Sequence, residues 1–230
     1  MGKNIISQAR GHGGPAYRVR KKAYQHRIKY PMKDGQAKII DIIHSAGHSA
    51  PLIKAIISNE VFYNPAFNGA YVGQEINLGQ KAELGNILML KEIPLGIKVY
   101  NIEINPGDGG KMTRSAGSSA TTFKKYDNNK ISILTPKKKE IILSGDCRAT
   151  IGEIAGGGKI FKPFVIAGKK FYKMKARNKL WPRTSAVKMN AVDHPFGSGR
   201  GKRIKPKIAK RNAPAGARVG HIRPRRTGRR

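Results

Sequence analysis

Positive charge is distributed very unevenly along this 230-residue chain, and that distribution limits what the chain can fold into. Residues 1–33 contain nine Lys and Arg and no acid, and residues 154–230 contain 23 against the single acid Asp193. Residues 34–153 are almost balanced, with 14 basic and 12 acidic residues. A compact body carrying the whole net charge of +33 would repel itself unless a polyanion neutralised it. The pattern predicts a nearly neutral folded middle between two basic extensions. Nucleic acid is the commonest polyanionic partner, and an anionic membrane surface is the alternative.

The middle segment has the hydrophobic pattern of an all-β protein. Short runs rich in Ile, Val and Leu occur at 39–43, 52–57, 87–90, 131–134 and 141–143. Turn-forming Gly, Pro, Asn and Asp separate these runs, and no long helical period lies between them. Closely spaced strands of this kind are typical of small barrels or sandwiches rather than of a βαβ sheet. We therefore predict two small β-barrels, at 34–94 and 97–155, joined where a proline and a glycine interrupt the chain.

The flanking segments, 1–33 and 156–230, have little apolar surface to bury and many charges. We expect both to be long, irregular basic extensions that become ordered when they bind a partner. One short helix is predicted at 168–180, where lysines surround Phe171, and Pro182 would end it.

Cysteine content and hydropathy indicate an intracellular protein. The single cysteine, Cys147, cannot form an internal disulfide or a cysteine-built zinc site, and it fits a reducing cytoplasm. No stretch approaches the roughly 18 apolar residues of a membrane-spanning helix. The first residues lack the apolar segment of a secretory signal. We therefore expect a cytoplasmic protein.

No sequence motif indicates catalysis or metal binding. His44 and His48 have the i, i+4 spacing of a helical metal pair, but Gly47 and Pro51 favour a turn there. The glycine run before Lys159 lacks the other residues of a nucleotide-binding phosphate loop. That run is either a flexible hinge or a stretch of backbone that lies closely against RNA.

Aromatic residues lie among the basic ones in both extensions. Tyr17, Tyr24, Phe171 and Tyr172 have basic neighbours, a pattern that suits single-stranded or irregular RNA. The lone Trp181 is either a core residue or a platform for an unpaired base, because Lys and Arg flank it.

Several strings in the sequence resemble the signatures of one known family. The longest is Met189-Asn190-Ala191-Val192-Asp193-His194-Pro195, followed by Gly197-Ser198-Gly199. Others, in the family's order, lie at 7–11, 93–96, 99–103, 106–110, 147–152, 155–158, 162–164, 214–216, 219–221 and 225–229. Over nearly its whole length the chain resembles the universal L-two family of large-subunit ribosomal proteins, in its archaeal and eukaryotic branch. It differs at 59–84, which is shorter and more divergent than usual. It also differs at 200–203, where many relatives carry further histidines.

The resemblance implies an OB-fold barrel followed by an SH3-like barrel, with basic extensions threading through ribosomal RNA (rRNA). It implies a structural constituent of the large ribosomal subunit that lies near the peptidyl-transferase region and supports subunit association, tRNA accommodation and assembly. Peptide-bond catalysis belongs to RNA in that family, so we expect no enzymatic activity. The expected partners are large-subunit rRNA, neighbouring ribosomal proteins and, at the subunit interface, small-subunit rRNA. We expect no membrane binding, no homo-oligomer, and no cofactor other than Mg²⁺ held by the surrounding rRNA.

The predicted rRNA contacts are mainly basic residues of the extensions. His194 belongs, by resemblance, to the family's most recognisable loop. Because it lacks the partners of a catalytic set, we expect it to hydrogen-bond RNA or its own loop. The complete predicted set is Arg10, His12, Tyr17, Arg18, Arg20, Lys21, Arg27, Arg114, Arg148, Gly157, Lys159, Lys169, Lys170, Arg177, Trp181, Arg183, Met189, Asn190, His194, Arg200, Arg203, Arg211, Arg218, His221, Arg223, Arg225 and Arg226.

Two other classes of protein are alternatives. An RNA-modifying enzyme would need a cofactor pocket, and no Gly-rich nucleotide-binding turn follows any of the apolar runs. A membrane-surface protein would need an amphipathic helix with a bulky apolar face, and 168–180 is too uniformly basic for that.

Overall fold

The computed structural model describes residues 2–197, 208–209 and 212–222. These residues form two compact units. One unit, called the strand unit below, comprises residues 21–177. The other, the terminal unit, combines the N-terminal residues up to Arg20 with the described residues from Asn178 onward. The N-terminal segment and the described residues from Asn178 onward therefore belong to the same unit.

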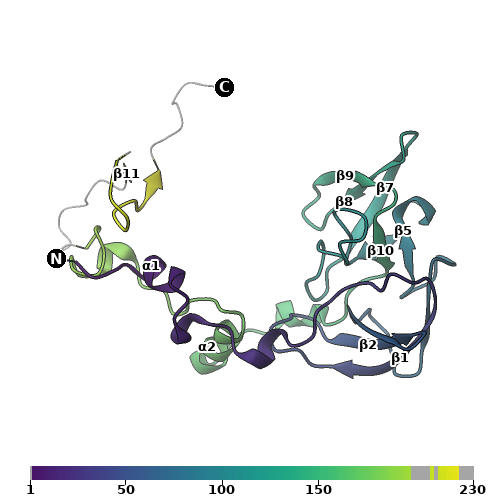
Figure 1. Ribbon diagram of the computed structural model, residues 1–230, viewed down its shortest axis with the longest axis horizontal. Coiled ribbons are helices and arrows are strands. Elements are labelled where there is room, and N and C mark those ends of the chain that lie inside the picture. The colour runs from purple at the N-terminus through teal and green to yellow at the C-terminus, as the bar shows by residue number, and fades with distance from the viewer. Residues whose placement is uncertain (1, 198–207, 210–211, 223–230) are drawn as a thin grey trace. The chain divides into compact units, whose positions relative to one another are not determined.

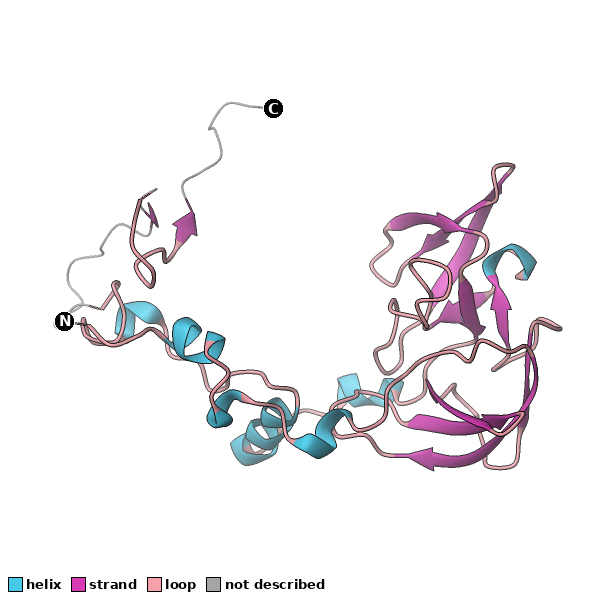
Figure 2. Ribbon diagram, viewed as in Figure 1, coloured by secondary structure: helices cyan, strands magenta, loops and turns pink. Residues whose placement is uncertain are grey.

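Most of the regular secondary structure in the strand unit is β-strand (Figures 1 and 2). The strands are β1 (Gly35–Ile43), β2 (Leu52–Ile57), β3 (Glu60–Pro65), β4 (Glu75–Leu78), β5 (Ile87–Met89), β6 (Lys98–Tyr100), β7 (Ala120–Tyr126), β8 (Lys130–Leu134), β9 (Glu140–Ser144) and β10 (Arg148–Ile151). They pair in the order β3-β2-β1-β4-β5-β10-β6-β7-β8-β9. The contact between β4 and β5 is parallel, and the other pairs are antiparallel. The predicted all-β class is confirmed, and each of the five predicted apolar runs overlaps a strand.

The hairpin formed by β2 and β3 shows how the local sequence produces this structure. Strand β2 buries four apolar side chains on the faces of the sheet, and its backbone is paired on both edges, with β1 and with β3. Ser58 and Asn59 then turn the chain with positive φ angles of 43° and 69°. A two-residue loop with two left-handed residues matches the natural twist of an antiparallel pair. The turn therefore fixes the β2–β3 register, in which Ile57 faces Glu60.

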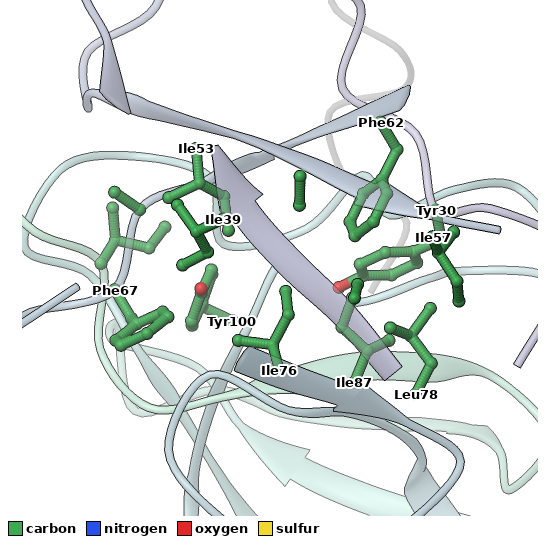
Figure 3. Packing of buried hydrophobic residues seen from close by; sticks show 14 of the residues in the cluster. Tyr30, Ile39, Ile53, Ile57, Phe62, Phe67, Ile76, Leu78, Ile87 and Tyr100 are labelled. Atoms are coloured by element: carbon green, nitrogen blue, oxygen red, sulfur yellow. The ribbon is translucent and has the colours of Figure 1, made fainter. Parts of the chain in front are cut away.

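Two hydrophobic cores lie in the strand unit. The first includes the fully buried side chains of Ile39, Ile53 and Phe67, and it also takes in Tyr100 (Figure 3). The second is formed by residues from β5 to β10 together with the segment that follows β5. Its members are Leu88, Leu90, Ile93, Val99, Ile102, Ala120, Ile131, Ile133, Leu143, Cys147, Ala149 and Ile151. Successive side chains of a strand point to opposite faces. As a result β5 gives Ile87 to the first core and Leu88 to the second, and β6 divides Tyr100 and Val99 in the same way.

A buried polar network ties the two cores together. The Tyr30 hydroxyl donates to the carbonyl of Asn101 at 2.7 Å and lies 2.7 Å from Thr150 Oγ1. Asn64 Nδ2 donates to the same threonine oxygen at 2.9 Å, and Asn101 Nδ2 donates to Asn64 Oδ1 at 2.8 Å. Burial raises the pKa of Tyr30 above its usual range, so its hydroxyl stays protonated and able to donate. Asn101 Oδ1 has no partner among the described residues. The other bonds hold Asn101 and Thr150, whose sequence neighbours include members of the second core, to Tyr30 of the first core.

The helices differ from the prediction of one helix at 168–180. Helix α2 runs from Ala167 to Ala176, and Asn178 adopts a left-handed φ of 50°, which a continuing α-helix does not allow. The helix predicted at 168–180 is therefore present, but it ends at Ala176 instead of close to Pro182. The terminal unit contains a second α-helix, α1 (Ile6–Gly11), which the sequence did not predict. There, the side chain of Gln8 accepts the backbone N–H of Ile5 at 3.1 Å and so satisfies a free donor at the helix start.

Short 3₁₀ segments connect these elements. They are η1 (Pro15–Tyr17), η2 (Lys21–Tyr24), η3 (Leu90–Glu92), η4 (Gly157–Phe161) and η5 (Ala186–Lys188). The terminal unit also holds a short parallel pair, β11 (Ile208–Ala209) with β12 (His221–Ile222).

Candidate nucleic-acid interface

Within the terminal unit, hydrogen bonds join the N-terminal segment to residues far along the chain. The N–H of Lys3 donates to the carbonyl of Val192 at 2.9 Å. Arg10 Nη2 donates to the carbonyl of Asn178, also at 2.9 Å. The Lys3 ammonium also lies 3.9 Å from the carboxylate of Asp193. Lys3 thus contacts the loop that carries His194, and Arg10 of α1 contacts the segment that follows α2.

This arrangement encloses a cavity of about 540 Å³, called the terminal cavity below. Five residues from the predicted set line it: Arg10, Arg183, Met189, His194 and Arg218. They come from three separate segments of the sequence. The structure therefore brings together site residues that sequence reasoning could name but could not place side by side.

The loop that contains His194 determines which of its two ring nitrogens can donate a hydrogen bond. The backbone N–H of Phe196 donates to His194 Nδ1 at 3.0 Å. A ring nitrogen that accepts a hydrogen bond carries no proton, so in the neutral ring the proton is on Nε2. The backbone N–H of His194 donates to the carbonyl of Asn190, and its own carbonyl accepts from Gly197. The histidine thus sits in a tight loop that fixes its ring and leaves Nε2 as a donor.

Other predicted residues of the terminal unit lie elsewhere on it. His12, Arg18, Arg20, Asn190 and His221 are exposed, whereas Tyr17 and Trp181 are half-buried. Arg18 Nε donates to the carbonyl of Gly13 at 2.8 Å. Six predicted residues, Arg200, Arg203, Arg211, Arg223, Arg225 and Arg226, lie outside the described residues.

The strand unit has its own basic cavity, of about 650 Å³, lined by residues that include Arg27, His48 and Arg114. Arg114 Nη2 donates to the carbonyl of Ile28 at 3.1 Å, while its buried Nε has no partner among the described residues. Burial lowers the pKa of Arg114. Burial also lowers the pKa of His48, and electrostatic interactions, first with Arg114 and then with His26, lower it further. Partly desolvated cations of this kind favour an anionic ligand.

A second group of cations gathers where η4 approaches α2. Lys159 Nζ donates to the carbonyl of Ser49 at 3.3 Å. Partial burial, and then the neighbouring cation of Lys173, lower the pKa of Lys159 to about 8. Arg177 adds a third positive charge to this environment. An anion placed here would relieve the repulsion between these groups.

The remaining predicted residues of the strand unit have separate positions. Lys21 and Lys169 are exposed, and Lys170 is half-buried. Gly157 packs against the backbone of Gly117, with so little space that a side chain on Gly117 would collide with it. The glycine run thus permits close packing within the protein, a role that neither of the two sequence interpretations included.

Arg148 has an internal role in the structure. Its Nη1 donates to the carbonyl of Pro31 at 2.6 Å, and its Nη2 donates to Glu103 Oε1 at 3.3 Å. The side chain of Arg148 is 12% exposed and that of Glu103 is fully buried. Its guanidinium is therefore occupied by the protein itself, and an rRNA contact by Arg148 remains a prediction.

Sequence reasoning missed some residues of this surface. His26, Lys29, His48 and Lys111 line the basic cavity of the strand unit, and Lys173 adjoins Lys159. These residues are far apart in the sequence, so only the fold brings them together. A large apolar surface was missed too. Ile160, Phe161 and Val165 are 78%, 85% and 86% exposed on a segment rich in lysine.

Clusters of metal-ligating side chains and membrane-spanning helices are both absent from the described parts of the chain. Within residues 2–197, 208–209 and 212–222, no group of three or more His, Cys, Asp and Glu side chains is placed to hold a metal ion. The helices in those same ranges are all too short or too polar to cross a lipid bilayer.

The chain is similar to known proteins along its whole length. A family model described as Ribosomal Proteins L2, C-terminal domain, matches residues 83–216. The large ribosomal subunit protein uL2 of Methanococcus maripaludis strain S2 is 46% identical over 243 aligned residues, which cover all of both chains. The uL2 proteins of Hyperthermus butylicus and Methanococcoides burtonii are each 43% identical. They align over all of this chain and over 99% and 100% of their own lengths.

Proposed function

The chain belongs to the uL2 family of large-subunit ribosomal proteins, archaeal type, and we propose that its basic cavities and extensions bind large-subunit rRNA near the peptidyl-transferase region. Family membership makes it a structural constituent of the large ribosomal subunit. It is thus part of a ribonucleoprotein that works in translation in the cytoplasm.

One observation carries the rRNA-binding proposal: cations are gathered at positions where the protein supplies few acids. Lys159, Lys173 and Arg177 lie close enough together to lower the pKa of Lys159 to about 8. Among the residues that line the basic cavity of the strand unit, Asp108 is the one acid. RNA phosphates would neutralise these groups and release condensed counterions, which is the main source of affinity in such complexes.

The exposed apolar side chains of this segment fit the same partner. Phe161 and Phe171 are 85% and 39% exposed, and Lys173 lies 5.2 Å above the ring of Phe164. Aromatic faces among lysines suit unpaired bases, which stack on rings while their phosphates meet ammonium groups. We assign this segment to irregular rRNA rather than to a regular duplex.

The fold proposal is an OB-fold barrel at 34–94 followed by an SH3-like barrel at 97–155, between extensions at 1–33 and 156–230. The presence of two separate hydrophobic cores supports it. In this proposal the barrels are rigid platforms, because buried strands and the polar network between the cores hold their shape. The extensions supply most of the cations.

The wider roles follow from the family and are proposals for this chain. They are support of subunit association, tRNA accommodation and assembly. The chain is proposed to act without catalysis and without a cofactor, apart from Mg²⁺ that the surrounding rRNA holds. Its proposed partners are large-subunit rRNA, neighbouring ribosomal proteins and small-subunit rRNA at the interface. Self-association is not part of the proposal.

The experiment is binding of the full chain to a large-subunit rRNA transcript from an archaeal relative, measured at several salt concentrations. About ten phosphate contacts predict a log–log slope of roughly −7 to −9. The Lys159→Ala/Lys173→Ala double variant should reduce the magnitude of the slope by about 1.4 to 1.8. Lys137 and Lys139 are exposed at the β8–β9 hairpin, so the Lys137→Ala/Lys139→Ala variant removes the same charge as a control and should leave the slope unchanged. An affinity that hardly depends on salt would contradict the proposal.

A further inference from the structure

The terminal cavity has one apolar wall. Ile5, Leu180, Pro182, Met189 and Val219 contribute to it. Leu180 and Met189 are only half-buried, so their apolar surface is incompletely covered by the protein. The cavity volume of about 540 Å³ lies in the range of sites that enclose a small molecule, roughly 300 to 1,000 Å³. An apolar group that enters this cavity would cover that surface.

The rest of the cavity is cationic. Arg10, Arg183 and Arg218 line it, and none of its lining residues is an Asp or Glu. Arg10 is oriented by its bond to the carbonyl of Asn178, and Arg218 Nε donates to the carbonyl of Ala213 at 3.1 Å. Each of these bonds uses only part of the five N–H donors of a guanidinium. Planar guanidinium groups held in this way are suited to bind the oxygens of a phosphate.

His194 adds a hydrogen-bond donor to the lining. Because Nδ1 accepts the N–H of Phe196, the proton of the ring is on Nε2. A carbonyl oxygen or ring nitrogen of a base would accept this hydrogen. The lining therefore matches a ligand with an anionic group, a hydrogen-bond acceptor and a flat apolar body.

We propose that the terminal cavity holds one unstacked nucleotide of large-subunit rRNA. Its base lies against Leu180 and Met189, and its phosphate lies between the arginines. This inference rests on the proposed function, which supplies the rRNA, and adds to it a defined pocket for a single residue of that RNA. A base-paired residue does not fit the description, because its faces are covered by its neighbours in the stack. Sequence-specific RNA recognition commonly targets bases that are splayed out in this way.

The test uses the full-length chain bound to the archaeal large-subunit rRNA transcript. Ultraviolet crosslinking with mass-spectrometric mapping identifies which nucleotides bond to which residues. We expect crosslinks from Leu180 and Met189 to converge on one unpaired nucleotide. Crosslinks spread over many nucleotides, or a neighbouring protein's side chain in the cavity of the assembled subunit, would overturn the inference.

Two variants make the test quantitative. Leu180→Trp fills the cavity without changing the charge, so affinity should fall about tenfold through loss of base stacking while the salt slope stays constant. Arg183→Ala removes one exposed cation from the cavity rim. It should lower affinity about fivefold to tenfold and reduce the slope by about 0.7 to 0.9. Lys188→Ala removes one exposed cation of η5 that does not itself line the cavity, and should leave affinity within about twofold.

The outcomes separate this inference from the proposed function. If wild-type binding depends steeply on salt but Leu180→Trp and Arg183→Ala behave like Lys188→Ala, the pocket is wrong and the rRNA-binding proposal stands. If the wild-type chain shows neither salt-dependent binding nor crosslinks, the proposed function itself fails. Circular dichroism checks that Leu180→Trp is folded. Because Arg183 is exposed, its variant decides the question even if the tryptophan variant misfolds.

Discussion

Replacing Arg148 by methionine should loosen the second hydrophobic core without changing how salt affects RNA binding. The Glu103 carboxylate accepts backbone N–H groups from Gly107, Gly109 and Arg148 at 3.2, 3.0 and 2.9 Å, in addition to the guanidinium at 3.3 Å. Arg148→Met removes the guanidinium alone. Breaking a buried ion pair from one side costs about 3 to 5 kcal/mol. Because three backbone donors remain for Glu103, we expect the lower value, about 3 kcal/mol.

Cys147 provides the assay, because it is the only cysteine, belongs to the second core and directly precedes Arg148 in the sequence. Its side chain is fully buried, and burial raises the pKa of its thiol to about 11, so a thiol reagent reacts only when the core opens. A loss of 3 kcal/mol multiplies the population of open molecules, and hence the labelling rate, by roughly 150. The rate is measured on the full chain with an excess of a chromogenic disulfide reagent.

The matched control is Lys98→Met. It also exchanges a cation for methionine and breaks an ion pair, that between Lys98 and Glu153 at 3.0 Å, but both side chains are substantially exposed. An exposed pair contributes little, so labelling should change by no more than about fivefold. A labelling rate for Arg148→Met within threefold of wild type, together with a smaller salt slope for rRNA binding, would refute this reasoning. Arg148 would then be an RNA contact, as first predicted from the sequence.

Two further predictions follow. Gly110→Ala should destabilise the chain clearly more than Gly107→Ala in thermal unfolding. Both glycines have left-handed φ angles, of 84° and 80°, which cost an alanine about 1 to 2 kcal/mol. Only at Gly110 would the new Cβ also collide with Asn101. Equal losses of stability in the two variants would contradict this prediction. Acidification from about pH 7.5 to 5.5 should lower stability through His48, because burial and then nearby cations depress its pKa in the folded protein. The stability it contributes is present above the unfolded pKa of about 6.5 and is lost as pH falls. An NMR titration should therefore give His48 a pKa below 6.5, and a value above 6.5 would contradict the expectation. The stability of a His48→Gln variant should depend less on pH than that of the wild type.

Much of the fold could be predicted because strands leave a local signal. Leu52–Ile57 reads as an apolar run bounded by turn residues, and it forms β2. Strand β7, Ala120–Tyr126, was missed because beyond Thr122 its side chains are exposed and polar or aromatic, which hides the apolar pattern. The helix end at Ala176 was also missed. It depends on one residue, Asn178, turning left-handed, which no periodicity reveals.

The site was predictable in composition and not in geometry. The excess of arginine and lysine outside 34–153 is visible in the sequence, and it selected Arg10, Arg183 and Arg218. That these three line one cavity depends on pairing between distant segments. Arg148 shows the opposite case: it is a basic residue like the others in sequence, but a buried carboxylate 45 positions away binds it inside the protein. Charge counts identify the kind of partner, and only packing tells which charges are free to meet it.

The bond from Arg10 to the carbonyl of Asn178 joins residues 168 positions apart, which has a consequence during synthesis. At translation speeds of about 5 to 20 residues per second, the first segment leaves the ribosome roughly 8 to 34 seconds before its partner is made. The whole strand unit, residues 21–177, is completed in that interval.

In the nascent chain the strand unit is therefore complete while the basic N-terminal segment still lacks the residues that it contacts in the terminal unit. The terminal cavity can form only after Gly220, the last of its lining residues in the sequence, has been made. A product truncated before Arg218 would keep the basic N-terminal segment and lack Arg218, Val219 and Gly220 of the cavity lining.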